Sequence, residues 1–97
     1  MKVIWTEPAR DRLVEIEEYI EQNSPERAVS FVLELMEQAE TLANFPESGR
    51  IVVEDETQSA RELIYKGYRI IYRIDNSSVY VLSVFEGSRL MRRDDLK

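Results

Sequence analysis

The sequence predicts an α+β fold in which a hairpin of two helices packs on one face of a small antiparallel sheet, in the order β-αα-βββ. Apolar residues recur with the 3.6-residue period of a helix up to about residue 43, and a Ser-Pro pair interrupts this stripe near its middle. Near residue 60 the pattern changes to the alternation of strands. The length of 97 residues is that of a single domain spanning residues 1–97.

The first predicted elements are a short strand and a helix. The β-branched run Lys2–Trp5 predicts the strand. Thr6 suits the N-cap of the helix that follows, and Pro8 suits its first turn. We expect this helix to span Pro8–Gln22. Its apolar stripe consists of Ala9, Leu13, Ile16 and Ile20.

A second helix is predicted over Pro25–Ala43. Ser24 is a typical capping residue, and Pro25 fits the first helical position. The stripe continues through Ala28, Phe31, Val32, Leu35, Ala39 and Leu42. Because the connection between the two helices is so short, they must lie side by side as an antiparallel hairpin.

The second half of the chain predicts three strands. Turn-forming residues at 44–50 end the helical region, and the acidic stretch Val52–Ser59 is expected to be an exposed loop. The strand-like runs that follow are Arg61–Lys66, Tyr68–Asp75 and Val79–Phe85, and short turns suited to hairpins separate them.

The middle strand has two different faces. Side chains alternate along a strand, so Tyr68, Ile70, Tyr72 and Ile74 share one face and Arg69, Ile71 and Arg73 share the other. We expect the first face to pack on the helices and the second to be open to solvent, where its two arginines would form a docking surface for carboxylates. The alternative is that both arginines are ordinary solvated charges.

The composition excludes several kinds of site. The chain has no cysteine, which rules out disulfides and thiolate zinc sites, and no histidine, which rules out Ser-His and Cys-His triads. Proton transfer would fall to Glu, Asp, Lys or Tyr. We therefore expect no cofactor, no metal and no catalytic residue.

Hydropathy and charge bear on location and partners. No apolar run approaches the roughly 18 residues that span a bilayer, and the start lacks the apolar core of a signal peptide, so we expect a cytoplasmic protein without a membrane partner.

The net charge of −6 argues against direct binding to nucleic acid. Residues 1–60 carry five basic and fourteen acidic side chains, whereas residues 61–97 carry eight and five. The basic second half is thus a candidate site for an anionic partner, or simply a solvated surface.

Several segments occur in the order and spacing of a known family. They are Trp5–Ala9 (WTEPA), Ile16–Ile20 (IEEYI), Ser24–Ala28 (SPERA), Leu42–Arg50 (LANFPESGR), Arg61–Leu63 (REL) and Gly67–Arg73 (GYRIIYR). Together they resemble the RelE/ParE superfamily, the toxins of bacterial toxin–antitoxin pairs, over nearly the whole chain. The resemblance implies the helix-hairpin fold described above and a cognate antitoxin as partner. It also implies a target, which is DNA gyrase for ParE-type members and messenger RNA on the ribosome for RelE-type members.

One departure from the family favours the ParE branch. Many members carry a His-Gly pair followed closely by Arg after the last strand, and this chain has Glu86, Gly87 and Arg89 in that stretch. A carboxylate there would repel a scissile phosphate by about 1–4 kcal/mol at 4 Å, for effective dielectric constants of 80 to 20.

We therefore predict a type II toxin that inhibits DNA gyrase by binding it and is neutralised by an antitoxin. The predicted binding residues are Arg61, Tyr65, Arg69, Arg73, Glu86 and Arg89. One alternative is a RelE-like ribosome-dependent endoribonuclease, in which arginines stabilise phosphate charge and a carboxylate is the base. Another is a degenerate member that binds antitoxin and is no longer toxic.

Overall fold

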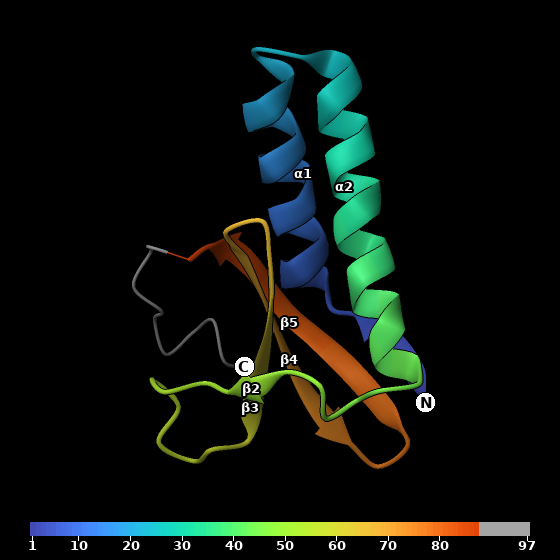
Figure 1. The fold of residues 1–97 in the computed structure, drawn as a ribbon, viewed down its shortest axis with the longest axis vertical. Helices are drawn as coiled ribbons and strands as arrows, with labels where there is room; N and C mark the ends of the chain where they lie inside the picture. The colour runs from blue at the N-terminus through green and yellow to red at the C-terminus, as the bar shows by residue number, and fades with distance from the viewer. Residues whose placement is uncertain (88–97) are drawn as a thin grey trace.

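The computed structural model describes residues 1–87 and contains two helices packed on one five-stranded sheet (Figure 1). The elements are β1 (Lys2–Trp5), α1 (Glu7–Glu21), α2 (Pro25–Glu40), the 3₁₀ turn η1 (Thr41–Ala43), β2 (Arg50–Ile51), β3 (Ala60–Tyr65), β4 (Tyr68–Asp75) and β5 (Ser78–Glu86). The helices form an antiparallel hairpin, and its closed end projects beyond the sheet (Figure 1).

Both helices have the N-cap residues that the sequence predicts, Thr6 and Ser24. The Thr6 hydroxyl accepts a hydrogen bond from the Ala9 amide at 3.3 Å, and the Ser24 hydroxyl accepts one from the Arg27 amide at 3.2 Å. These bonds satisfy amide groups that a helix start leaves without an intrahelical partner. The bounds differ slightly from the predicted ones: α1 spans Glu7–Glu21 rather than Pro8–Gln22, and the last predicted turn of the second helix is the 3₁₀ turn η1.

The direction of one strand corrects the predicted topology. The strand order is β1-β5-β4-β3-β2, and β1 runs parallel to β5, so the sheet is mixed rather than antiparallel. Alternation predicts that a strand exists, but its direction follows from the pattern only where a hairpin turn joins it to its neighbour. No such turn joins β1 to β5. The short edge strand β2 was not predicted, because two residues are too few to show a period.

The main core lies between the helices and the sheet. Leu35 on α2 is fully buried against Ile70 on β4 and Val81 on β5. Tyr72 is also fully buried, in a cluster with Leu42 and Val79. The prediction that this face of β4 packs on the helices is confirmed.

The opposite face of the sheet is not open to solvent as predicted. Val52, Ala60, Ile71, Leu82 and Phe85 form a second buried cluster on this face. Val52 lies at the start of the acidic loop, so part of the loop packs onto the sheet. One apolar side chain of the loop, Val52, packs against the apolar side chains of the strands. Most of the other loop residues are polar, so the sequence does not predict this packing.

A buried carboxylate holds the loop in shape. Asp55 is 6% exposed and accepts hydrogen bonds from the amides of Thr57, Ser59 and Ala60 at 3.1, 3.0 and 2.8 Å. The hydroxyl of Thr57 donates a further bond at 2.7 Å. These donors favour the charged form, with the Thr57 side chain contributing most, and lower the pKa of Asp55 to about 2.

Candidate functional site

The turn after the helices is built around one tyrosine. The Tyr72 hydroxyl donates to the Pro46 carbonyl at 2.7 Å and accepts from the Gly49 amide at 2.9 Å. A Cβ at Gly49 would lie 2.5 Å from that hydroxyl and 2.6 Å from the carbonyl oxygen of Glu62, so only glycine fits there. Pro46 and Gly49 therefore hold this turn against the sheet through their hydrogen bonds with Tyr72.

Next to this turn, an ion cluster covers the outer face of β3 and β4. Glu62, which is 3% exposed, accepts from Nε of Arg50 and from Nε of Arg69, each at 2.6 Å. Arg69 also holds the Glu54 carboxylate with both terminal nitrogens, at 3.0 and 3.1 Å. The Arg69 bond lowers the pKa of the Glu54 carboxyl. Two arginines and two carboxylates are thus paired with one another.

This pairing contradicts the expectation that Arg69 is exposed to solvent. The residue is 7% exposed, and its guanidinium also lies over the Phe85 ring, 5.4 Å from the centroid. Arg69 is therefore neither a solvated charge nor an open docking group. The prediction of an exposed face is wrong at this position, because Arg69 is buried and already binds the carboxylates of Glu62 and Glu54 in the same chain.

The other two arginines on the sheet lie in different places. Arg73 shares the outer face with Arg69 and lines a groove of about 220 Å³ together with Thr6, Asp75 and Tyr80. Arg61 points to the helix side of β3, where it donates to the Gly49 carbonyl at 2.8 Å. Arg61 thus supports the glycine turn and does not join the face that carries Arg69 and Arg73.

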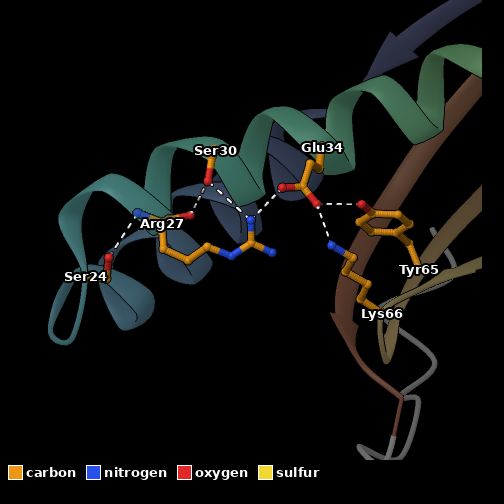
Figure 2. A network of polar contacts seen from close by, with 6 residues as sticks. All are labelled: Ser24, Arg27, Ser30, Glu34, Tyr65 and Lys66. Atoms are coloured by element: carbon orange, nitrogen blue, oxygen red, sulfur yellow. Dashed lines mark hydrogen bonds and ion pairs between the residues drawn. The ribbon is translucent and has the colours of Figure 1, made fainter.

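Tyr65 belongs to a polar network that ties α2 to the β3–β4 turn (Figure 2). Its hydroxyl donates to the Glu34 carboxylate at 2.5 Å, and Lys66 and Arg27 bind the same carboxylate at 3.1 and 2.6 Å. The Tyr65 ring stacks on Phe31 with centroids 6.2 Å apart. Three donors on one carboxylate, with Tyr65 contributing most, lower the pKa of Glu34 to about 2.

Glu86 ends β5 on the helix side of the sheet. It is paired with Tyr68 on β4 and lines a groove of about 160 Å³ whose other wall is α1. The pKa of Tyr68 is raised above its ordinary value, first by burial and then by the negative charge of Glu86. Arg89, the last predicted binding residue, lies outside the described residues.

Within residues 1–87, the predicted residues therefore do not form one patch. Arg73 and Glu86 line two separate grooves, while Arg61, Tyr65 and Arg69 bind groups within the chain. Sequence reasoning missed the acids Glu34 and Glu62, and it took Glu54 to be one of the solvated acids of the loop. Glu62 could have been found, because the two-residue turn at Lys66 and Gly67 fixes the register and places Glu62 diagonally across from Arg69.

The described residues show no sign of a metal site or a membrane span. Within residues 1–87, no three acidic side chains come together as ligands for a metal ion. No helix in the same range has the length and apolar character needed to cross a bilayer.

Comparisons with known proteins agree with this architecture. A family model described as the ParE toxin of the type II toxin–antitoxin system parDE matches residues 3–91. The protein "Toxin RelE2" of Caulobacter vibrioides is 34% identical over 90 residues, which cover 92% of this chain and 98% of that protein.

Two solved structures share the fold. One is titled as the chromosomal ParDE toxin–antitoxin system of P. aeruginosa; it is 23% identical, with a TM-score of 0.77, and the match covers 89% of this chain and 95% of that one. The other is titled as the toxin–antitoxin complex RelBE2 of Mycobacterium tuberculosis; it is 25% identical, with a TM-score of 0.67, covering 88% and 95%. The match to the family model over almost the entire chain shows that this protein belongs to the ParE toxins of type II toxin–antitoxin systems.

Proposed function

We propose that this toxin acts by binding DNA gyrase and that a cognate antitoxin neutralises it by binding the toxin. The family model that it matches is that of ParE, and one of the structures with the same fold is titled as a toxin–antitoxin complex. In this proposal the protein acts through contact surfaces and makes or breaks no covalent bond.

The observation that carries the proposal is the pairing of Arg50 and Arg69 with Glu54 and Glu62. A ribonuclease of this size needs cations that are available to a phosphate while charge develops on it. Here the Arg69 guanidinium already binds two carboxylates, and a phosphate would have to displace them. The absence of histidine from the chain and the carboxylate of Glu86 point in the same direction.

The two groove-lining residues remain as candidate contacts. Arg73 offers a guanidinium beside Asp75 and Tyr80 on the outer face, and Glu86 offers a carboxylate beside α1. Arg61, Tyr65 and Arg69 act indirectly in this proposal, because they hold the turn, the helix hairpin and the loop in place.

Expression of the toxin alone in bacterial cells tests the proposal. Gyrase inhibition predicts that the DNA damage response is induced while protein synthesis continues at first. Co-expression of the antitoxin encoded beside the toxin gene should abolish the response. Arrest of translation without DNA damage would contradict the proposal.

A RelE-like ribonuclease is the second candidate, because the relative of 34% identity is named Toxin RelE2. Its general base would have to be a carboxylate near an arginine, and Glu62 fits that description. Glu62 is 3% exposed, however, so the cluster would have to open before a ribose hydroxyl could reach it. Cleavage of messenger RNA on purified ribosomes by the purified toxin would favour this candidate.

A further inference from the structure

A groove beside α1 combines aromatic rings with carboxylates. It measures about 160 Å³, and its walls include Glu15 and Tyr19 from α1, Tyr68 from β4 and Glu86 from β5. An α-helix with its side chains is about 10–12 Å across, so a groove of this volume has room for a side chain rather than for a helix.

The two tyrosines are held differently. Tyr19 lies on α1 and is 61% exposed. Tyr68 is half-buried and tilted against Phe31, with ring centroids 5.1 Å apart, so its position is fixed by the core. The groove therefore has one rigid aromatic wall and one that can adjust to a ligand.

The charges around the groove favour a cation. Glu15 and Glu86 bring two carboxylates, and Arg12 brings one guanidinium, which binds Glu15 at 3.2 Å. The described side chains around the groove thus carry a net negative charge. Burial raises the pKa of Tyr68, and the negative charge of Glu86 raises it further. The helix that borders it, α1, belongs to the acidic half of the chain.

We propose that this groove receives an arginine or lysine side chain of the antitoxin. The faces of the tyrosine rings attract the cation, and the carboxylate of Glu86 pairs with it. The inference rests on the proposed function, because it names the chemistry of one contact in the toxin–antitoxin complex. It also gives Glu86 a role, namely to bind a basic side chain of the partner.

Titration calorimetry of the full-length toxin with the antitoxin encoded beside it tests this inference. Tyr19→Ala and Glu86→Gln should each raise Kd about tenfold, the effect expected of a partly desolvated cation contact. Tyr19→Phe keeps the ring and should bind nearly as well as the unaltered toxin. Glu37→Gln, which removes one exposed negative charge from α2, is the matched control and should leave Kd unchanged.

A small probe tests the groove without the antitoxin. N-acetylarginine methylamide should shift the NMR signals of the Tyr19 and Tyr68 rings, and the neutral analogue N-acetylcitrulline methylamide should not. Thermal melting of each variant verifies that it is folded. Since Tyr19 is exposed, Tyr19→Ala should melt within a few degrees of the unaltered toxin.

Three outcomes would overturn the inference, and they can be told apart. If Tyr19→Ala and Glu86→Gln bind the antitoxin within twofold of the unaltered toxin, the contact lies elsewhere and the proposed function stands. If the same variants keep antitoxin affinity but lose gyrase inhibition, the groove serves the target. If the unaltered toxin does not bind the antitoxin at all, the proposed function fails as well.

Discussion

Among single residues, Glu62 is central to the ion cluster on the outer face of the sheet. Its carboxylate joins the edge strand through Arg50 and the acidic loop through Arg69, which in turn holds Glu54. Because Glu62 and Arg69 are both buried, removal of either one would leave the other's buried charge without this ion pair.

Replacing Glu62 with alanine should therefore cost much more than a surface substitution. Glu62→Ala leaves the Arg69 guanidinium buried beside Glu54 alone and should lower the free energy of unfolding by about 3–5 kcal/mol. Urea unfolding followed by circular dichroism measures the change. The paired substitution Glu62→Leu with Arg69→Met removes both charges and should cost clearly less than Glu62→Ala. An equal loss in both variants would show that burial of unpaired charge is not the cause.

Arg73 is the arginine of the outer face that lines a groove. Arg73→Glu should weaken binding of antitoxin or gyrase by about 2–5 kcal/mol if the contact is buried in the complex. Arg10→Glu makes the same change of charge on the exposed side of α1 and is the control for long-range electrostatics. If the Arg73 variant binds with unchanged affinity, Arg73 is not at the contact, and the helix hairpin becomes the expected binding surface.

Between elements, one carboxylate joins α2 to the β3–β4 turn. Glu34 on α2 has its pKa lowered from 4.5 to about 2 by Tyr65, Arg27 and Lys66 (Figure 2). A pKa lowered by folding adds stability above the unfolded value, and that stability is lost as the pH falls from about 4.5 towards 2.

Glu34→Gln should remove this pH-dependent contribution. The variant should melt at a lower temperature than the unaltered protein at pH 7, and the difference should shrink as the pH falls from about 4.5 to about 2. Thermal melts at a series of pH values measure it, with Glu37→Gln on the same helix as the control. A difference that stays constant across the series would contradict the role given to this carboxylate.

The helices and strands also show which parts of the fold can be predicted from the sequence. The helices were predicted almost to the residue, because Thr6 and Ser24 are capping residues and the apolar stripes extend over several turns. The parallel direction of β1 and the packing of the loop on the outer face were not predicted. Both depend on contacts between distant segments, such as Lys2 with Ser78 and Val52 with Phe85, which leave no periodic pattern in the sequence.

The candidate site was harder to predict than the fold for a related reason. Alternation correctly placed Arg69 and Arg73 on one face of β4. It gave no indication that Glu54 folds back from the loop to pair with Arg69. A charged side chain on a strand can therefore be taken as a binding residue only after the acids of neighbouring segments have been placed.

For the whole molecule, stability and partner binding are linked. A domain of this size buries a limited core, so a ligand of the folded state can supply a large share of its stability. Leu35 is fully buried in the main core, and Leu35→Ala should cost about 2–5 kcal/mol. The variant should melt well below the unaltered toxin and recover part of the loss when saturating antitoxin is added. Leu33→Ala, at an exposed position on another face of α2, is the control and should have little effect.

The decisive measurement for gyrase inhibition is the supercoiling activity of purified DNA gyrase as the purified toxin is titrated into the reaction. We expect supercoiling to fall in proportion to the toxin bound and addition of antitoxin to restore it. Messenger RNA on purified ribosomes should stay intact at the same toxin concentrations. Undiminished supercoiling together with cleavage of messenger RNA would contradict the claim and establish the toxin as a ribonuclease.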